Sequence, residues 1–487
     1  MNFKKILLFF IITVMIIFTS CSNGNNANSG RESENSKAAD VDENLLENET
    51  TILKDNLPDN IDYEGYDFTI YLRDTEINYI DFFIETEEGD ILNDIVYQRN
   101  KKTEERFNIN FKYGFFPYDD WSNTTLSNII MAGDDAFDFA AVHGTAVSRF
   151  ATSHLTLDWY KNMPYVDLDA PWWPAGIIEN LASFKSLYGA TGDISYTYLN
   201  YAGCLLFNKG LFKNLDIEYP YNDVVNGNWT LDNFISVVKK GMLDLDGDGV
   251  MNPDYDMYGL GVGNSYHYPI NVFYCAGDRV ISIRSDGLPE LTMYNERTVE
   301  IYDKFFEMMD SGAVHISDLS IPWQGFQHER ALMYNASLTD ILKNRALEFD
   351  IGILPMPKYD ESTPKYYLPV NQNTSMIIVP VTAQNTDRTS IIVEALAAEG
   401  YNSVIPAYFE LNLKTKQARD DESAAMLDYI RDGVLCDYGV FDTNVIGGLN
   451  NFGSSLVETN TSFTVMYERN KTAVEANIEK LKEEYGF

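Results

Sequence analysis

Alternating acids form the sharpest chemical motif in the sequence. Asp244, Asp246 and Asp248 occupy the first, third and fifth positions of a segment whose sixth residue is Gly249. This spacing matches the first half of an EF-hand-type calcium loop, in which carboxylate oxygens suit a hard cation and the glycine permits a sharp bend. The pattern predicts a structural Ca²⁺ site in this segment.

The second half of the same segment departs from the calcium-loop pattern. Its twelfth position, where a bidentate glutamate is expected, holds Tyr255, and the flanking acids are Asp254 and Asp256. Either acid could complete the shell if the loop bulges by one residue around Pro253. A solvated acidic turn without metal is the alternative that the sequence leaves open, and no other cofactor is required.

Motifs that would carry catalysis are absent from the sequence. It contains no G-x-S-x-G, H-E-x-x-H, phosphate-binding P-loop or G-x-G-x-x-G. Its five histidines have no metal-like spacing, and with 73 acidic residues a pair of carboxylates for glycoside hydrolysis can be drawn anywhere. We therefore predict that the protein is not an enzyme.

Two adjacent tryptophans, Trp172 and Trp173, lie between prolines. On an extended segment the two rings cannot face the same way, so we expect one to be buried and the other exposed. An exposed indole can stack on the C–H face of a pyranose ring, which makes either residue a candidate ligand contact.

The beginning of the chain indicates where the protein is located. Two lysines precede an apolar run at 6–18, and small residues then lead to Cys21, which is the pattern of a secretory signal at 1–20. A cysteine in this place resembles the bacterial lipobox, although Phe18 stands where leucine is usual. The resemblance implies that Cys21 is lipidated and holds the protein at the extracytoplasmic face of the cell membrane; an ordinary secreted protein is the alternative.

Composition sets further limits on the remainder of the chain. The stretch 21–59 is acidic, rich in Ser and Asn and without an apolar period, so we expect a disordered tether. The formal charge of −37 excludes nucleic acid as a partner, and no second apolar run of membrane-spanning length follows. The three cysteines beyond the anchor form no metal or redox pattern and are expected to be buried thiols.

Hydrophobic periodicity outlines the elements of the body. Alternation predicts a strand at 66–72, helical spacing predicts a helix at 91–107 capped by Asp90, and strands are expected at 109–113 and 137–142. The later elements are a helix capped by Thr230, strands at 351–354 and 375–379, and a C-terminal helix with Val474, Ile478, Leu481 and Tyr485 on one face. Strands and helices in alternation predict an α/β fold with a mostly parallel sheet.

Five motifs resemble those of extracellular solute-binding protein family 1, the maltose-binding-protein-like group, and they occur in the family's order. They are the segments 133–142, 187–195, 204–212, 229–234 and 349–358. The resemblance implies a two-lobed α/β fold that closes around a ligand cleft at a hinge. We expect one lobe at 60–190 plus 334–380 and the other at 191–333 plus 381–487.

The resemblance also implies which residues face the cleft. His143 follows the strand at 137–142, Asp193 lies on the hinge segment ahead of Tyr196 and Tyr198, and Trp323 lies on a Pro/Gly loop. Amides at 371–373 precede the last predicted strand. The expected ligand contacts are thus Trp323, Trp172 or Trp173, Asp193, His143, Tyr196 and Asn371.

The function implied by the resemblance is that of a monomeric substrate-binding lipoprotein, which binds a mono- or oligosaccharide and delivers it to the membrane permease of an ABC importer. Two alternatives stay open at this point. One is a surface-attached polysaccharide hydrolase, and the other is a ligand sensor that presents its loaded form to a membrane receptor kinase.

Overall fold

The computed structural model describes residues 52–263, 268–317, 320–343, 347–415, 420–442, 456, 459 and 461–487. The predicted signal, Cys21 and most of the predicted tether lie outside these residues. Contacts within the chain separate Met1–Thr51 from Ile52–Phe487, and every element described below belongs to the second unit. Among the described residues, no helix is long and apolar enough to cross a membrane.

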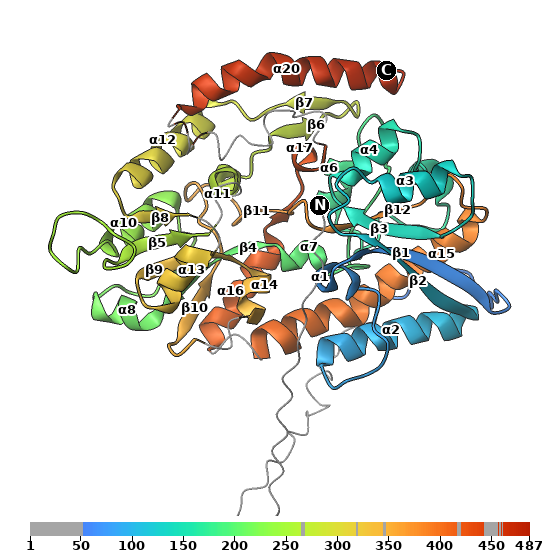
Figure 1. Ribbon diagram of the computed structural model, residues 1–487, viewed down its shortest axis with the longest axis horizontal. Coiled ribbons are helices and arrows are strands. Elements are labelled where there is room, and N and C mark those ends of the chain that lie inside the picture. Colours follow the sequence, from blue (N-terminus) through green and yellow to red (C-terminus); the bar gives the residue numbers. More distant parts are fainter. Residues whose placement is uncertain are drawn as a thin grey trace, which may run out of the picture. The chain divides into compact units, whose positions relative to one another are not determined.

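The first sheet has four strands in the order β12-β3-β1-β2 (Figure 1). They are β1 (Tyr66–Asp74), β2 (Ile109–Pro117), β3 (Phe139–His143) and β12 (Ser375–Ile378). β1 runs parallel to β2 and β3, while β12 is antiparallel to β3. Helices α2 (Ile91–Phe107) and α15 (Thr386–Glu399) contact each other beside this sheet. The Asp90 carboxylate accepts from the backbone N–H groups of Leu92 and Asn93, which fixes the start of α2.

The second sheet has five strands in the order β10-β4-β9-β5-β8. They are β4 (Gly203–Asn208), β5 (Tyr258–Val262), β8 (Val314–Ile316), β9 (Ala331–Ser337) and β10 (Ile351–Leu354). β5 is parallel to β8 and β9, whereas β4 is antiparallel to β9 and β10. Helices α10 (Leu231–Lys240) and α13 (Ser320–Gln327) pack against β5.

Further elements connect and cover the two sheets. They are α1 (Glu76–Tyr79), α3 (Thr124–Met131), α4 (Ala146–Thr152), α5 (Trp159–Asn162), α6 (Ala175–Leu181), α7 (Thr197–Asn200), α8 (Lys209–Asn214), α9 (Tyr221–Val225), α11 (Tyr268–Phe273), η2 (Tyr274–Ala276), β6 (Ile281–Ile283), β7 (Pro289–Leu291), α12 (Glu296–Asp310), α14 (Leu338–Lys343), β11 (Leu368–Pro369), η4 (Gly400–Val404), η5 (Ala407–Thr415), α16 (Asp421–Asp432), β13 (Val434–Leu435) and α17 (Tyr438–Phe441). The C-terminal helix α20 (Phe463–Glu484) packs along β7 and α12.

The elements predicted from periodicity are present, and their apolar faces are buried. The C-terminal helix buries Val474, Ile478 and Leu481, and the Thr230 hydroxyl accepts from the Asn233 N–H at the start of α10. Buried side chains form two hydrophobic cores, a smaller one around the first sheet and α15 and a larger one that includes the second sheet. Cys204, Cys275 and Cys436 are free and buried, as predicted.

The residue limits of the two lobes stay a prediction, but the strand pairings show how the chain crosses between sheets. Residues 351–354 were expected with the first sheet, whereas β10 pairs with β4 in the second. β12 then returns to the first sheet beside β3. α15, expected with the second lobe, contacts α2 beside the first sheet. The crossings come later in the chain than the motif spacing suggests.

Candidate functional site

Polar and aromatic side chains gather where strands of the first sheet end. His143 is the last residue of β3, and Arg73 lies next to the end of β1. Because β1 and β3 are parallel, their carboxyl ends meet at one edge of the sheet, where ligands bind in open α/β folds. Trp121, which follows β2, and the turn at 371–373, which precedes β12, reach the same edge. We call Arg73, Trp121, His143, Asn371 and Asn373 the strand-end site.

His143 is held in one orientation by contacts to both ring nitrogens. Nδ1 lies 2.8 Å from the Thr145 hydroxyl and accepts from the Thr145 backbone N–H at 3.3 Å, so the proton is on Nε2. Nε2 donates to the side-chain oxygen of Asn373 at 3.1 Å. Burial, with Arg73 as a further cause, lowers the pKa of His143 to about 4. The imidazole is therefore neutral near pH 7.

The turn at 371–373 is fastened to the end of β3. The Asn373 N–H donates to the Asn371 side-chain oxygen at 2.9 Å, and the Gly144 N–H donates to the Gln372 carbonyl at 2.9 Å. A Cβ on Gly144 would come within 2.5 Å of the Phe441 ring, so only glycine fits at this close approach. These contacts fix the amides that the sequence placed near the cleft.

Trp121 is the exposed aromatic of the site, with 54% of its surface accessible. Its ring meets the His143 ring edge-on, with centroids 5.2 Å apart at 90°. The Arg73 guanidinium carbon lies 5.6 Å from the Trp121 ring centroid, and Arg73 Nη2 donates to the Tyr118 carbonyl at 3.0 Å. Trp121 and Arg73 were not among the ligand contacts predicted from the sequence. The position of Trp121 just after a predicted strand is the signal that could have indicated it.

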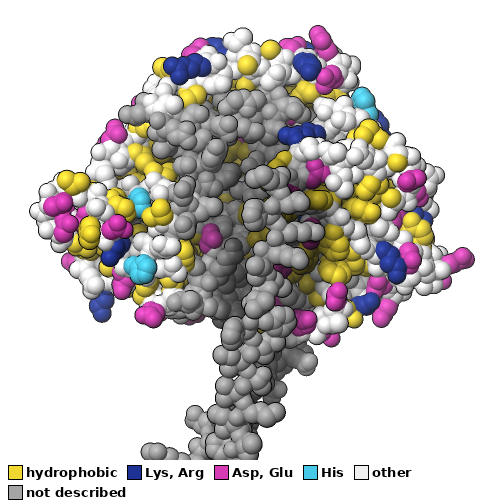
Figure 2. All heavy atoms as spheres, viewed as in Figure 1, with side chains coloured by type: hydrophobic (Ala, Val, Ile, Leu, Met, Phe, Trp, Pro, Cys, Tyr) yellow, Lys and Arg dark blue, Asp and Glu magenta, His cyan; other side chains and the backbone are white. Residues whose placement is uncertain are grey.

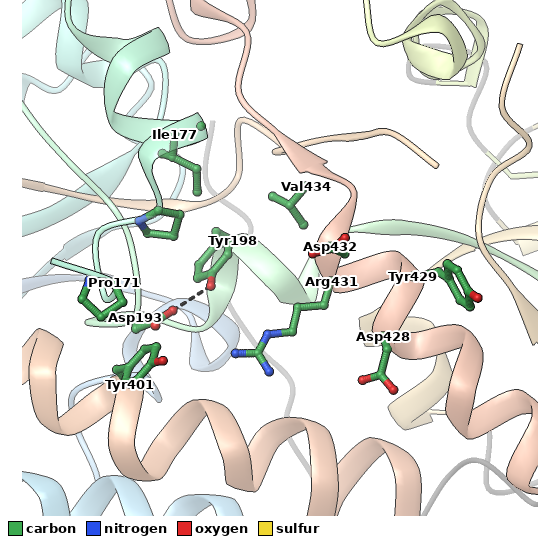
Figure 3. A pocket seen from close by; sticks show the side chains of 12 residues that line it. Pro171, Ile177, Asp193, Tyr198, Tyr401, Asp428, Tyr429, Arg431, Asp432 and Val434 are labelled. Carbon is green, nitrogen blue, oxygen red and sulfur yellow. Dashed lines mark hydrogen bonds between the residues drawn. The ribbon is translucent and has the colours of Figure 1, made fainter. Parts of the chain in front are cut away.

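Asp193 lies in a separate pocket of about 640 Å³ (Figure 3). Its carboxylate accepts from the Tyr198 hydroxyl at 2.7 Å. Arg431 extends from the end of α16 toward the side where Asp193 and Tyr401 lie. Burial raises the pKa of Asp193 to about 7, against the opposing effects of the Tyr198 hydrogen bond and the Arg431 charge. We call this cavity the Asp193 pocket.

The paired tryptophans are structural. Trp172 and Trp173 are 3% and 1% exposed, so the expectation that one of them would be exposed is wrong. Their indole N–H groups donate to the two oxygens of the buried Glu394 carboxylate, at 3.0 and 2.9 Å. One carboxylate on α15 thereby satisfies both rings, which explains how two adjacent indoles can both be buried.

Two other aromatic candidates differ from their expected settings. Trp323 lies on α13 rather than on a loop, is half-buried, and meets the Tyr334 ring with centroids 5.1 Å apart. Tyr196, expected to face the cleft, is buried and stacks on Tyr408. Contact of either residue with a ligand stays a prediction.

The acidic loop has the compact geometry that its sequence predicts. Gly247 and Gly249 donate their N–H groups to Asp244, and both adopt positive φ. Asp244, Asp246 and Asp256 can bring one carboxylate oxygen each within 4.8 Å of the others. Asp256 is buried, whereas Asp248 accepts from the Val250 N–H and the Asp254 N–H donates to Asn252, both within the loop. Of Asp254 and Asp256, the two acids expected to complete the set of Ca²⁺ ligands, Asp256 is the one that lies beside Asp244 and Asp246.

Comparisons with known proteins place the fold. Neither a family model nor a curated protein sequence matches the chain. Solved structures do match: the sugar-binding protein MalE of Xanthomonas citri (TM-score 0.57, 13% identity, covering 85% of this chain and 98% of that one) and UspC of Mycobacterium tuberculosis (0.56, 13%, 84% and 99%). The cyclic alpha-maltosyl-1,6-maltose binding protein of Arthrobacter globiformis matches similarly (0.55, 12%, 85% and 100%).

The chain has the two-lobed α/β fold of these binding proteins. This confirms the predicted fold class, and the matches extend over nearly the whole length of the solved structures. Two of these three proteins, from Xanthomonas citri and Arthrobacter globiformis, are named for binding. At 12–13% identity the likeness defines the architecture, and the function must be argued from the site.

Proposed function

We propose that the protein is the extracytoplasmic substrate-binding lipoprotein of an ABC importer, and that it binds a carbohydrate between its lobes as a monomer. The observation that carries the proposal is the strand-end site, where an exposed indole stands beside neutral hydrogen-bonding groups at the edge where this fold binds ligands. The names of solved structures that share the fold, which include a sugar-binding protein and a cyclic alpha-maltosyl-1,6-maltose binding protein, support the same substrate class.

The chemistry of the site suits a sugar. A pyranose presents C–H faces to an aromatic ring, and Trp121 offers such a ring. Hydroxyl groups need fixed partners, and the amides of Asn371 and Asn373 are held in place by hydrogen bonds, with the neutral His143 orienting the Asn373 side chain. Fixed partners lose little conformational entropy when the ligand arrives, which favours affinity.

The charge pattern agrees with a small solute rather than a polyanion as partner. The formal charge is −37, and on the face drawn in Figure 2 acidic and basic side chains are interspersed. A phosphate backbone would be repelled by the net charge. Cys21, outside the described residues, would carry the lipid that keeps the protein at the membrane.

A thermal-shift screen across mono- and oligosaccharides, followed by calorimetry, tests the proposal. A ligand at about 100 times its Kd adds roughly 2.7 kcal/mol to the folded state, which is easily resolved. Recovering each ligand intact separates binding from the hydrolase alternative, because an enzyme would consume it. Stimulation of a reconstituted permease, against stimulation of a receptor kinase, separates import from sensing. If no saccharide shifts the midpoint, the carbohydrate assignment fails.

We also propose that Asp244, Asp246 and Asp256 hold a structural Ca²⁺, with Asp248 as a further ligand. The support is the clustering of three carboxylates on one loop, with Asp256 buried beneath it. Excess chelator should lower the unfolding midpoint of the wild-type protein and leave an Asp246→Ala variant unchanged. Equal midpoints with and without chelator in the wild type would identify the loop as a turn only.

A further inference from the structure

Arg73 is a buried cation whose charge the protein does not neutralise. Only 5% of the residue is exposed, and its one hydrogen bond to a described residue is to the Tyr118 carbonyl. No carboxylate of the described residues lies within ion-pair distance of its guanidinium. Burial accordingly lowers the pKa of Arg73.

Asp81 is a buried acid that forms no ion pair with Arg73. Asp81, which influences Tyr201, accepts from the Ser195 hydroxyl, and Arg99 donates to its backbone carbonyl. It is not among the groups that act on Arg73. A second cation, Arg149, acts with Arg73 to lower the pKa of His143. Two cations thus act on His143 at this edge of the sheet, although the chain as a whole has a formal charge of −37.

An unpaired buried charge is costly, and proteins keep one where a ligand supplies the partner. Arginine offers a planar fork of N–H donors that matches a carboxylate in two parallel hydrogen bonds. Apart from Nη2, which donates to Tyr118, the fork of Arg73 has no partner among the described residues, and it lies beside the indole on which a sugar would stack.

We propose that the ligand is an acidic sugar, whose carboxylate pairs with Arg73 while its ring stacks on Trp121. This inference rests on the proposed carbohydrate-binding function and narrows it to uronic acids and uronate-containing oligosaccharides. A neutral sugar would leave the guanidinium buried without a counter-charge. The acid supplies that charge, so the site selects it over the corresponding neutral sugar.

Matched ligands test the inference by calorimetry. The probes are D-glucuronate and D-galacturonate with their short oligomers, the methyl esters of these acids, the corresponding D-glucose and D-galactose series, and glucose 6-phosphate. We expect the acids to bind and the esters and neutral sugars to bind at least about 30-fold more weakly. Arg73→Gln should remove this preference, whereas Arg284→Gln, at an exposed remote position, should keep it.

Each other outcome has a definite meaning. Equal binding of acids and neutral sugars would overturn the inference and leave the proposed function standing, while binding of no saccharide would overturn both. Binding of glucose 6-phosphate instead of the uronates would overturn the inference that the group paired with Arg73 is a carboxylate. Without ligand, Arg73→Gln should unfold at the same temperature as the wild type or higher; a midpoint that falls as far as that of Arg99→Gln would make Arg73 structural and overturn the inference.

Discussion

Two buried arginines near the first sheet have opposite surroundings. Arg99 on α2 is 2% exposed and donates to the carbonyls of Ile194 and Asp81 and to the side-chain oxygen of Asn100. Arg73 at the end of β1 is 5% exposed and donates to one carbonyl. The Asp81 charge favours the Arg99 cation, whereas Arg73 has no carboxylate beside it among the described residues.

The difference indicates that Arg99 stabilises the fold, whereas Arg73 is placed to bind a ligand. Arg99 ties α2 to the segment at 194–197, which leads from the first sheet toward the second, so its hydrogen bonds exist whether or not a ligand is present. Among the described residues, the other donors of Arg73 have no partner, and they lie at the sheet edge where open α/β folds bind ligands. A fully satisfied buried cation is evidence for structure, and a partly satisfied one at a strand end is evidence for recognition.

Removing Arg99 should have the largest effect on stability. Arg99→Gln deletes the cation beside Asp81 and leaves two buried carbonyls without a donor. We expect the free energy of unfolding to fall by about 3–5 kcal/mol, the cost typical of breaking a buried charged network. Urea denaturation measures this, with Arg73→Gln as the matched variant. A loss below about 1 kcal/mol for Arg99→Gln would remove the distinction between the two arginines.

Trp121 should affect binding much more than folding. Truncating an aromatic anchor commonly costs about 2 kcal/mol or more, so Trp121→Ala should weaken sugar binding about 30-fold. Because 54% of the residue is exposed, the unfolding free energy should change by about 1 kcal/mol or less. Tyr160→Ala, at a remote residue that is 51% exposed, is the control for loss of surface aromatic area. Normal affinity in Trp121→Ala, measured by calorimetry, would exclude the indole from the site.

The fold was largely predictable because its signals are local. Alternation and helical spacing depend on neighbouring residues, and caps such as Asp90 and Thr230 mark helix starts in the sequence itself. The crossings between sheets were less predictable, since the pairing of β10 with β4 joins residues more than 140 positions apart. No local pattern distinguishes the sheet to which a short apolar strand belongs.

The candidate site was predicted only in part, because contacts between residues far apart in the sequence leave no local pattern. His143 and Asn371 were predicted from the family resemblance, and the structure brings them to one sheet edge, while their contact with a ligand stays a prediction. Trp172 and Trp173 were misread because their partner, Glu394, is over 200 residues away in the sequence. Arg73 was missed because an arginine is informative only when its burial and its lack of a carboxylate partner are known.

The smallest expected effect is on the pH dependence of stability and comes from Asp193. This buried acid extends the comparison of Arg99 with Arg73 to a group of opposite charge. Its pKa in the folded protein is about 7, above the ordinary 3.8, chiefly because of burial. Between these values the folded state keeps a proton that the unfolded state has released, so this group's contribution to stability declines as the pH rises from about 4 to 7. Because Asp193 lines a pocket of about 640 Å³, we expect solvent to limit the change to on the order of 1 kcal/mol.

Asp193→Asn, which cannot ionise, should remove that share of the pH dependence. Urea unfolding at intervals from pH 4 to 8 measures the slope, and Asp286→Asn, at an exposed ion pair, is the control that should retain it. An unchanged slope in Asp193→Asn would show that the carboxylate is ionised throughout and is neutralised by Arg431, as a structural pair would be. If the slope flattens and sugar affinity also falls, Asp193 belongs with Arg73 among groups kept for a ligand. If the slope flattens while affinity is unchanged, the Asp193 pocket lies apart from the sugar site.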